Sequence, residues 1–399
     1  MASKPKLAVG LDIGSAYTRV AVLLLEDGCL RFQGASEVPS RGWHRGQIAD
    51  QTAVADTIRD AIGQAEASSK LQIGSAVVGV GGPKVRSQQG RGLYEFGHRR
   101  PIERGDLSYA IELAARARLD EDRFLLQVLP QDFTVDGRTP IPHPLNIECE
   151  RLEAHALLVT TSLQEHQALI SAVHQAHLRV EESVFEAMAS SYASILPEER
   201  AGGVALLDIG AHSTNLIYYD GDTTLSAIGM PISGDHFTRD LGELKALSYE
   251  EAELLKIQYG CALLGLTADN ILIERPAEVG RPSREISRRE LIEILEARAA
   301  QLYDLVERGR VTYARELQMH EGIVLCGGGS QLTGMVEMAE KTLGCPARLA
   351  VPRGIIDWPD ELLNSLWTTA AGLAMYSARL QTRKDKPGGP NFWSLFTRK

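Results

Sequence analysis

The stretch Val204-Ala-Leu-Leu-Asp-Ile-Gly-Ala-His-Ser-Thr214 decides the fold, because a similar phrase already stands at Leu7 to Thr18 and ends in Asp-Ile-Gly-Ser-Ala-Tyr-Thr. In each copy an apolar run predicts a buried strand that ends at Asp-Ile-Gly. A second apolar run follows each copy, at 18–25 and at 215–219, and predicts the returning strand of a hairpin. We therefore expect the same hairpin, with a polar tip, once in each half of the chain.

The two hairpin tips carry residue types that suit phosphate and Mg²⁺. Glycine lets backbone N–H groups approach phosphate oxygens, hydroxyls can donate to them, and an aspartate can hold a hydrated hard cation. The candidates are Gly14 and Gly210, the hydroxyls of Ser15, Thr18, Ser213 and Thr214, and Asp12 and Asp208, which would act on the metal through water. For one copy alone, a strand-ending turn explains Asp-Ile-Gly equally well. Two copies, each opening one half of the chain, favour a clamp around a nucleoside triphosphate.

Composition is that of an α/β protein without export or zinc-binding features. With 399 residues, 44% of them hydrophobic and 6% aromatic, the chain should bury a large core in two or more domains. The five cysteines form no C-x-x-C pair, which predicts neither a zinc site nor a disulfide framework and favours a reducing cytoplasm. We recognise no signal-peptide core and no apolar run of bilayer length, so we expect a protein that is not exported. A net charge of −10 argues against nucleic acid as the main partner.

The duplicated hairpin resembles the paired phosphate loops of the actin, Hsp70 and sugar-kinase ATPase superfamily. Three phrases narrow the resemblance to the FtsA family of bacterial cell-division proteins: Val128-Leu-Pro-Gln-Asp-Phe133, Gly234-Asp-His236 and Tyr259-Gly-Cys-Ala262. The resemblance runs from Lys6 to Lys399. It implies an α/β, actin-like (ribonuclease H-like) duplicated fold, with two halves around a nucleotide cleft and a family-specific inserted subdomain.

The resemblance also implies a division into subdomains. They are 1A (5–82, 163–203 and 363–380), the inserted 1C (83–162), 2A (204–240 and 320–362) and 2B (241–319), with a linker and membrane-targeting helix at 381–399. Two segments rich in small residues, 186–193 and 368–374, predict helices that cross closely and could form a hinge pair. Ordinary packing helices are the alternative.

Further site residues are implied by the resemblance. Glu186, at the start of the first small-residue helix, would position or activate the attacking water and form the catalytic set with Asp12 and Asp208; an acid favoured by the helix dipole is the other interpretation. Glu253 and Lys256 would reach the ribose and adenine, although a surface ion pair explains them as well. Gly327, Gly328 and Gly329 match the adenosine motif. They do not fit a dinucleotide fingerprint, because Leu332 stands where its third glycine belongs.

The C-terminal segment differs in charge from the rest of the chain. From Arg379 to Lys399 there are six basic side chains and one acidic side chain, which predicts an anionic partner. Wound as a helix, the last nine residues gather their large apolar side chains on one side. The expected membrane contacts are Phe392, Trp393, Leu395, Phe396, Arg398 and Lys399. A disordered tail is the alternative, but four large apolar residues in nine are unusual for disorder.

The implied function is an ATP- and Mg²⁺-binding, actin-like protein that tethers the ring of the division tubulin FtsZ. It would form filaments on the cytoplasmic face of the inner membrane at the division site, through anionic lipids, and recruit later division proteins. Arg288 and Arg298, on the long helix expected within 284–319, would contact the FtsZ tail peptide, unless they only belong to a solvated helix face.

The second loop departs from the family pattern Asp-Ile-Gly-Gly-Gly-Thr-Thr-Asp. Ala211, His212, Ser213 and Asn215 replace Gly, Gly, Thr and Asp, which would crowd a phosphate and remove a negative charge. We therefore expect slow hydrolysis, or ATP held without turnover. The loop also resembles the pilus-assembly protein PilM, the main alternative within the fold. A soluble sugar or acetate kinase and an Hsp70-like chaperone are alternatives of other classes; the chaperone would need a second, β-rich domain.

Overall fold

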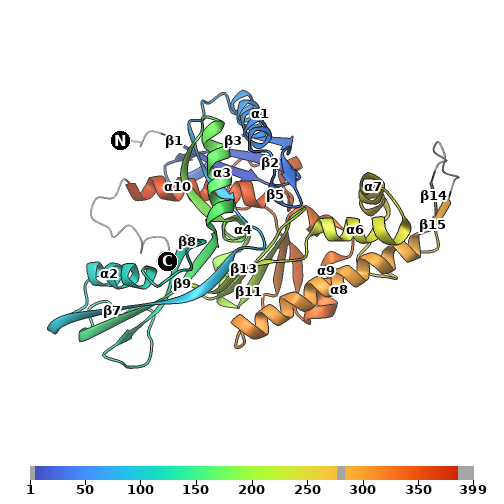
Figure 1. Ribbon diagram of the computed structural model, residues 1–399. Coiled ribbons are helices and arrows are strands. Elements are labelled where there is room, and N and C mark those ends of the chain that lie inside the picture. The colour runs from blue at the N-terminus through green and yellow to red at the C-terminus, as the bar shows by residue number, and fades with distance from the viewer. Residues whose placement is uncertain (1–4, 276–283, 385–399) are drawn as a thin grey trace.

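The computed structural model describes residues 5–275 and 284–384 (Figure 1). Its first five-stranded sheet has the order β10-β6-β1-β2-β3. β1 pairs antiparallel with β2 and parallel with β6, and β10 pairs parallel with β6. The strands are β1 (Lys6–Ile13), β2 (Tyr17–Glu26), β3 (Cys29–Pro39), β6 (Ser75–Val80) and β10 (Arg179–Phe185).

The second five-stranded sheet repeats this topology in the other half of the chain. Its order is β13-β12-β11-β16-β17, with two antiparallel pairs followed by two parallel pairs. The strands are β11 (Val204–Ile209), β12 (Thr214–Asp220), β13 (Thr223–Met230), β16 (Ile323–Cys326) and β17 (Ala347–Leu349). The actin-like duplicated fold predicted from the sequence is confirmed.

Both predicted hairpins form at the repeated phrase. In the first, Ile13 pairs with Thr18 across the tip; in the second, Ile209 pairs with Thr214. The apolar residues of β11 are wholly buried, as expected for a strand covered on both faces. The register places each Asp-Ile-Gly at the same end of its own sheet.

Two helices of small residues pack closely between the sheets, α4 (Glu186–Ser194) and α10 (Thr368–Lys384). A Cβ added at Gly372 of α10 would overlap the Ala189 carbonyl oxygen of α4, so the two backbones touch because glycine stands there. Ser190 and Thr369 also share a hydrogen bond of 2.9 Å between their hydroxyl oxygens. The predicted close crossing of these helices is confirmed. On the other face of the first sheet lie α1 (Gln51–Ser69) and α3 (Leu163–Gln175).

Between β6 and α3 the chain forms a separate three-stranded sheet of order β7-β9-β8, covered by α2 (Arg104–Ala115). The strands are β7 (Arg86–Pro101), β8 (Arg123–Val135) and β9 (Glu148–Ser162). In this stretch the sequence predicts a helix near 106–117 and strands near 124–136 and 155–160. It does not predict β7, which carries many polar, exposed residues and has no clear apolar alternation. Its partner β9, not its own pattern, holds it in the sheet.

The outer part of the second half is mainly helical, and Figure 1 places it at the opposite end of the molecule from α2 and β7. It contains α6 (Gly234–Lys245), α7 (Tyr249–Tyr259), α8 (Arg288–Tyr313), α9 (Met335–Leu343) and the hairpin of β14 (Leu272–Arg275) and β15 (Arg284–Ser287). The remaining elements are β4 (Trp43–His44), β5 (Gln47–Ile48), α5 (Pro197–Ala201) and the 3₁₀ turns η1 (Gly328–Gln331) and η2 (Asp360–Leu362). Within the described ranges, no helix combines the length and apolar character needed to cross a bilayer.

Candidate functional site

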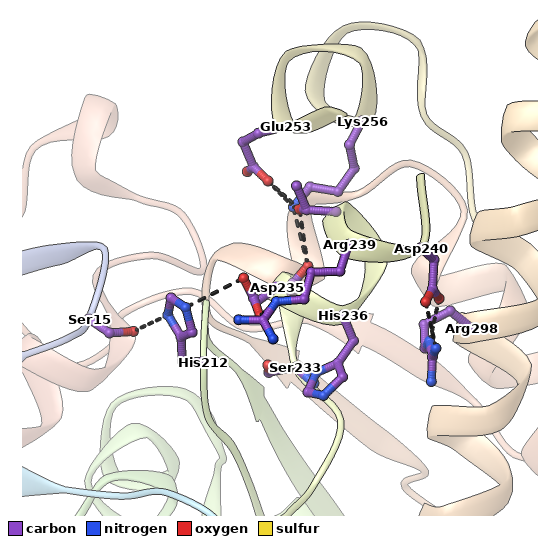
Figure 2. A network of polar contacts seen from close by, with 12 residues as sticks. Ser15, His212, Ser233, Asp235, His236, Arg239, Asp240, Glu253, Lys256 and Arg298 are labelled. Carbon is purple, nitrogen blue, oxygen red and sulfur yellow. Dashed lines mark hydrogen bonds and ion pairs between the residues drawn. The ribbon is translucent and has the colours of Figure 1, made fainter. Parts of the chain in front are cut away.

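The tips of the two hairpins meet across the interface between the halves. Ser15 Oγ of the first tip lies 3.0 Å from His212 Nδ1 of the second, within hydrogen-bond distance (Figure 2). On the other side of the ring, His212 Nε2 is 3.4 Å from Asp235 Oδ1, and Asp235 Oδ2 pairs with Arg239 Nε at 2.6 Å. The two loops predicted to bind phosphate therefore face each other, with the His212 imidazole between them.

The first turn of α6 holds the second loop in place. The backbone N–H groups of Gly234 and Asp235 donate to the carbonyl oxygens of Gly210 and Ala211, at 2.9 and 2.7 Å. Burial alone would raise the pKa of Asp235, but its contacts with His212 and Arg239 hold that pKa below its usual value. Asp235 is thus an anion that orients the imidazole of His212.

Three carboxyl groups lie close enough to influence one another: Asp12 and Asp208, which are buried, and Glu186, which is partly buried. Burial, partly offset by Arg19, raises the pKa of Asp12 to about 7. Burial raises the pKa of Asp208 to about 6, against the opposing hydrogen bond from Thr369 Oγ1, which is 3.2 Å from Asp208 Oδ2. Burial and the two aspartates raise the pKa of Glu186 well above its usual value. The predicted catalytic set is thus brought together, in surroundings that favour added positive charge.

The glycine turn after β16 lies against the second hairpin. A Cβ at Gly327 would overlap Asp208 Oδ1, and one at Gly329 would overlap the side chain of Ile209. At Gly328 the nearest atom would be Leu366 Cδ2, 3.8 Å away. Gly327 and Gly329 are therefore needed for close packing on β11, whereas Gly328 borders open space.

The predicted phosphate hydroxyls are not equivalent. Thr18 is buried and its hydroxyl lies 2.9 Å from Ser40 Oγ, which in turn donates to the Gly14 carbonyl oxygen at 2.6 Å. Thr214 Oγ1 is buried and has no hydrogen-bond partner in the described part of the chain. The Gly210 N–H already donates to the Ser213 carbonyl oxygen at 2.8 Å. Of the predicted phosphate hydroxyls, that of Ser15 reaches the other half of the chain, at His212.

Glu253 and Lys256 sit on α7 and pair with each other (Figure 2). Lys256 Nζ donates to Glu253 Oε2 at 2.7 Å and to Thr238 Oγ1 of α6 at 2.8 Å. The Thr238 hydroxyl also donates to the Glu253 carboxylate. Glu253, Lys256 and Thr238 thus connect α7 to α6. A ribose or base that bound here would have to compete for their hydrogen bonds.

Arg288 and Arg298, the predicted contacts for a partner peptide, make contacts within the chain. The Arg288 guanidinium donates to the carbonyl oxygens of Tyr259 and Ala268, at 3.0 and 2.5 Å. Arg298 forms a bidentate pair with Asp240, at 2.6 and 2.7 Å. A partner carboxylate would have to compete with these groups. The predicted membrane residues Phe392 to Lys399 lie outside the described residues.

The residues present fit a polyphosphate and a hydrated cation. Asp12 and Asp208 are buried and Glu186 is partly buried, the space over Gly328 is open, and the hydroxyl of Thr214 is unpaired in the described part of the chain. Among the described side chains, no group of three or more His, Cys, Asp or Glu is placed to hold a metal ion directly, and the two aspartates were predicted to act through water. The His212 imidazole stands between the two loops, in contact with Ser15.

Three residues that the sequence did not point to belong to this site. Arg19 lowers the pKa of both Asp12 and Asp208 and pairs with Glu37 Oε2 at 2.6 Å. Thr369 reaches Asp208 from α10, and Asn215 donates to Glu186 Oε2 at 2.8 Å. Asn215 was noted only as a departure from the family pattern. For Thr369, no local signal separates it from the other small residues of its helix.

Comparison with known proteins agrees with this architecture. The chain matches two family models, Cell division protein FtsA over residues 205–372 and the SHS2 domain inserted in FtsA over residues 82–160. Among solved structures, that of the PilM–PilN type IV pilus biogenesis complex has a TM-score of 0.65 at 17% identity and covers 93% of this chain and 98% of that chain. MreB 5 of Spiroplasma citri bound to AMPPNP gives a TM-score of 0.54 at 15% identity, over 94% of this chain and 97% of that chain. At these identities the structural likeness shows the fold alone.

Curated relatives match at higher identity and over most of their length. The cell division protein FtsA of Pseudomonas aeruginosa is 32% identical over 381 residues, covering 94% of this chain and 90% of that protein. The FtsA of Escherichia coli K12 is 29% identical over 385 residues, covering 94% and 91%. A match of this extent, reaching through both halves and the inserted sheet, shows that the chain belongs to the FtsA family of cell-division proteins.

Proposed function

We propose that this chain binds Mg-ATP between its two halves. The observation that carries the proposal is the meeting of the two hairpin tips, Ser15 against His212, beside three carboxyl groups whose pKa values are all raised. Ser15 and Thr214 would donate to phosphate oxygens, and Asp12 and Asp208 would hold the hydrated cation. The open face of Gly328 would receive the adenosine, with Glu253 and Lys256 at its ribose. The bound Mg²⁺ supplies the positive charge that the phosphate oxygens and the buried acids require.

Within this site Glu186 is the group that would direct a water molecule at the terminal phosphate. Its carboxyl is partly buried and its pKa is raised well above the usual value in the free protein, so a cation beside Asp12 and Asp208 would favour its ionised form. His212 lies where a phosphate would come, and Asn215 presents an amide in place of a negative charge. Both features support slow hydrolysis, or ATP held without turnover.

As a member of this family the chain would act by assembly. We infer that it forms filaments on the cytoplasmic face of the inner membrane at the division site, binds the FtsZ tail and recruits later division proteins. The basic, apolar C-terminal segment supports binding to anionic lipid. On the helical outer part of the second half, α7 exposes Leu254 by 57% and Ile257 by 69%, which offers apolar contacts to a partner peptide.

Calorimetric titration with Mg-ATP tests the nucleotide proposal. The wild-type chain should bind, D12A should lose binding while keeping the wild-type melting temperature, and E186A should bind normally but lower any hydrolysis. If wild type and D12A bind Mg-ATP with equal affinity, the proposed nucleotide site between the two halves is wrong. Equal turnover in E186A would remove Glu186 from the reaction.

A further inference from the structure

Asn215 is buried where β12 of the second half meets the loop that follows β6 of the first half. Its Oδ1 accepts a hydrogen bond from the Gly82 backbone N–H at 2.9 Å, and its Nδ2 donates to Glu186 Oε2 at 2.8 Å. Only 1% of Asn215 is exposed, so bulk water cannot substitute for either partner. One amide group therefore joins both halves of the molecule at the candidate catalytic carboxyl.

The partners decide which way the Asn215 amide points. A backbone N–H can only donate, so the atom that faces Gly82 has to be the oxygen, and the nitrogen then faces Glu186. A donating nitrogen meets a lone pair on Oε2 and leaves Glu186 free to be ionised. An aspartate here would instead present an oxygen to Oε2, and the contact would then require a proton on one of the two carboxyl groups.

Bare glycine backbone makes room for this contact on both sides of the interface. A Cβ at Gly81 would overlap Glu186 Oε2 and would lie 2.5 Å from Asn215 Nδ2. A Cβ at Gly229 of β13 would overlap the Gly82 carbonyl oxygen, and the Gly229 N–H donates to the Val85 carbonyl oxygen at 3.0 Å. The two halves of the molecule therefore approach each other closely at Asn215. This contact lies at the start of the chain segment that leads into β7.

We propose that Asn215 is a positioning residue for Glu186: its amide holds Oε2 and directs Oε1 toward the attacking water, while its oxygen anchors the root of the inserted sheet. The proposal rests on the function proposed above, in which Glu186 directs that water. It assigns a role to the residue that replaces a carboxylate in this loop. It also predicts that the polarity of the hydrogen bond, more than the shape of the side chain, matters at residue 215.

A polarity swap in the full-length, nucleotide-free chain tests the contact. Thermal unfolding is compared for wild type, N215D, E186Q and the double variant N215D/E186Q. N215D should lower the melting temperature most at high pH, where both carboxyl groups have lost their protons and two carboxylate oxygens face each other. E186Q alone should change it little, since the carbonyl oxygen of the new amide can still accept from Asn215. In the double variant, the new amide can donate to the new carboxylate, and most of the loss should be recovered.

N270D is the matched control, because Asn270 is exposed in a loop and the substitution adds the same charge without touching the cleft. A double variant as unstable as N215D, or an N215D chain as stable as N270D, overturns the proposal. Recovery in the double variant supports the direct contact, also where N215D itself fails to fold, and the turnover measurement below separates positioning from a merely structural contact.

A second measurement separates this inference from the proposed function. Mg-ATP affinity and turnover are determined for wild type, N215D and N270D. Positioning predicts that N215D changes turnover at least tenfold more than it changes affinity. Absence of Mg-ATP binding by wild type would refute the proposed function and with it the positioning role of Asn215. Binding by wild type with additive stability effects in the swap would leave the proposed function intact and refute the role of Asn215 alone.

Discussion

At the scale of single residues, two of the four departures in the second phosphate loop reach across to the first half. His212 contacts Ser15, and Asn215 contacts Glu186 and Gly82. The His212 Cβ also lies against Gly46, where an added Cβ would be 2.9 Å away. In the free protein His212 therefore fills space that a glycine would leave empty, and Asn215 donates a hydrogen bond to Glu186 that an ionised carboxylate could not donate.

His212 should compete with nucleotide for Ser15. A hydrogen bond of this kind contributes about 0.5–1.5 kcal/mol net, which corresponds to roughly a two- to tenfold change in affinity. H212G is therefore expected to bind Mg-ATP more tightly than wild type by that factor, with H212A in between, as measured by calorimetric titration. His98→Ala, at an exposed position of the inserted sheet, is the control. Weaker binding in H212G would instead make His212 a phosphate ligand.

Neighbouring glycines of the turn after β16 should respond differently to substitution. At Gly328 a side chain would enter open space, so G328V should keep the wild-type melting temperature and lose Mg-ATP binding. At Gly329 an added methyl group would overlap Ile209, so G329A should be destabilised by about 1–3 kcal/mol. Thermal unfolding and nucleotide titration of both variants check this. If G328V is destabilised as much as G329A, the interpretation that Gly328 borders open space is wrong.

At the scale of elements, α3 is fixed to two strands through His166. Its ring stacks on Phe124 of β8 with the centroids 3.7 Å apart, and His166 Nε2 lies 3.0 Å from Ser183 Oγ of β10. Burial lowers the pKa of His166. α3 is thus attached through the His166 imidazole, whose burial favours the neutral form.

This attachment predicts a pH dependence of stability. Because the folded-state pKa of His166 lies below its ordinary value of about 6.5, the unfolded chain binds more protons between the two values, and stability is lost as the pH falls through that window. Urea unfolding at pH 7.5 and pH 5.5 should show a larger loss for wild type than for H166Q. His174→Gln, at an exposed position of the same helix, should lose as much as wild type. Equal losses in wild type and H166Q would exclude His166 as a source of the dependence.

At the scale of the whole molecule, function would depend on many copies acting together. Burying the four large apolar side chains of the C-terminal segment would contribute at most about 1.5–3 kcal/mol each, and an interfacial helix does not reach full burial. A nine-residue helix is also unstable alone in water, so a single copy should bind membrane weakly and reversibly. Filaments carrying many such segments would bind far more tightly, because later insertions become intramolecular.

Liposome flotation tests this collective anchoring. Full-length protein with ATP and anionic lipid should float and carry an FtsZ tail peptide with it. A chain ending at Lys386, and the variant W393E, should remain in solution. The anchoring hypothesis is wrong if the shortened chain floats as well as the intact one. It is also wrong if membrane binding depends on neither ATP nor anionic lipid. Flotation without capture of the peptide would favour the PilM-like alternative.

The sequence by itself determined the local elements and the repeat that organises them. Sequence patterns within about twenty residues predict the two Asp-Ile-Gly hairpins, the glycine turn and the small-residue helices. This is possible because strand burial, backbone freedom and helix packing each require particular residue types close together in the sequence. β7 was missed because its pattern is polar and only β9 holds it in place.

Only the tertiary structure decided which side chains meet. Ser15 and His212 are 197 positions apart, and Thr369 and Asp208 are 161 positions apart, yet each pair lies within hydrogen-bond distance. The same packing placed Arg288 and Arg298 against groups of their own chain, and Asn215 on Glu186. Such contacts depend on how the two sheets and the helices between them pack. The local sequence around a residue does not indicate which distant residue it will contact.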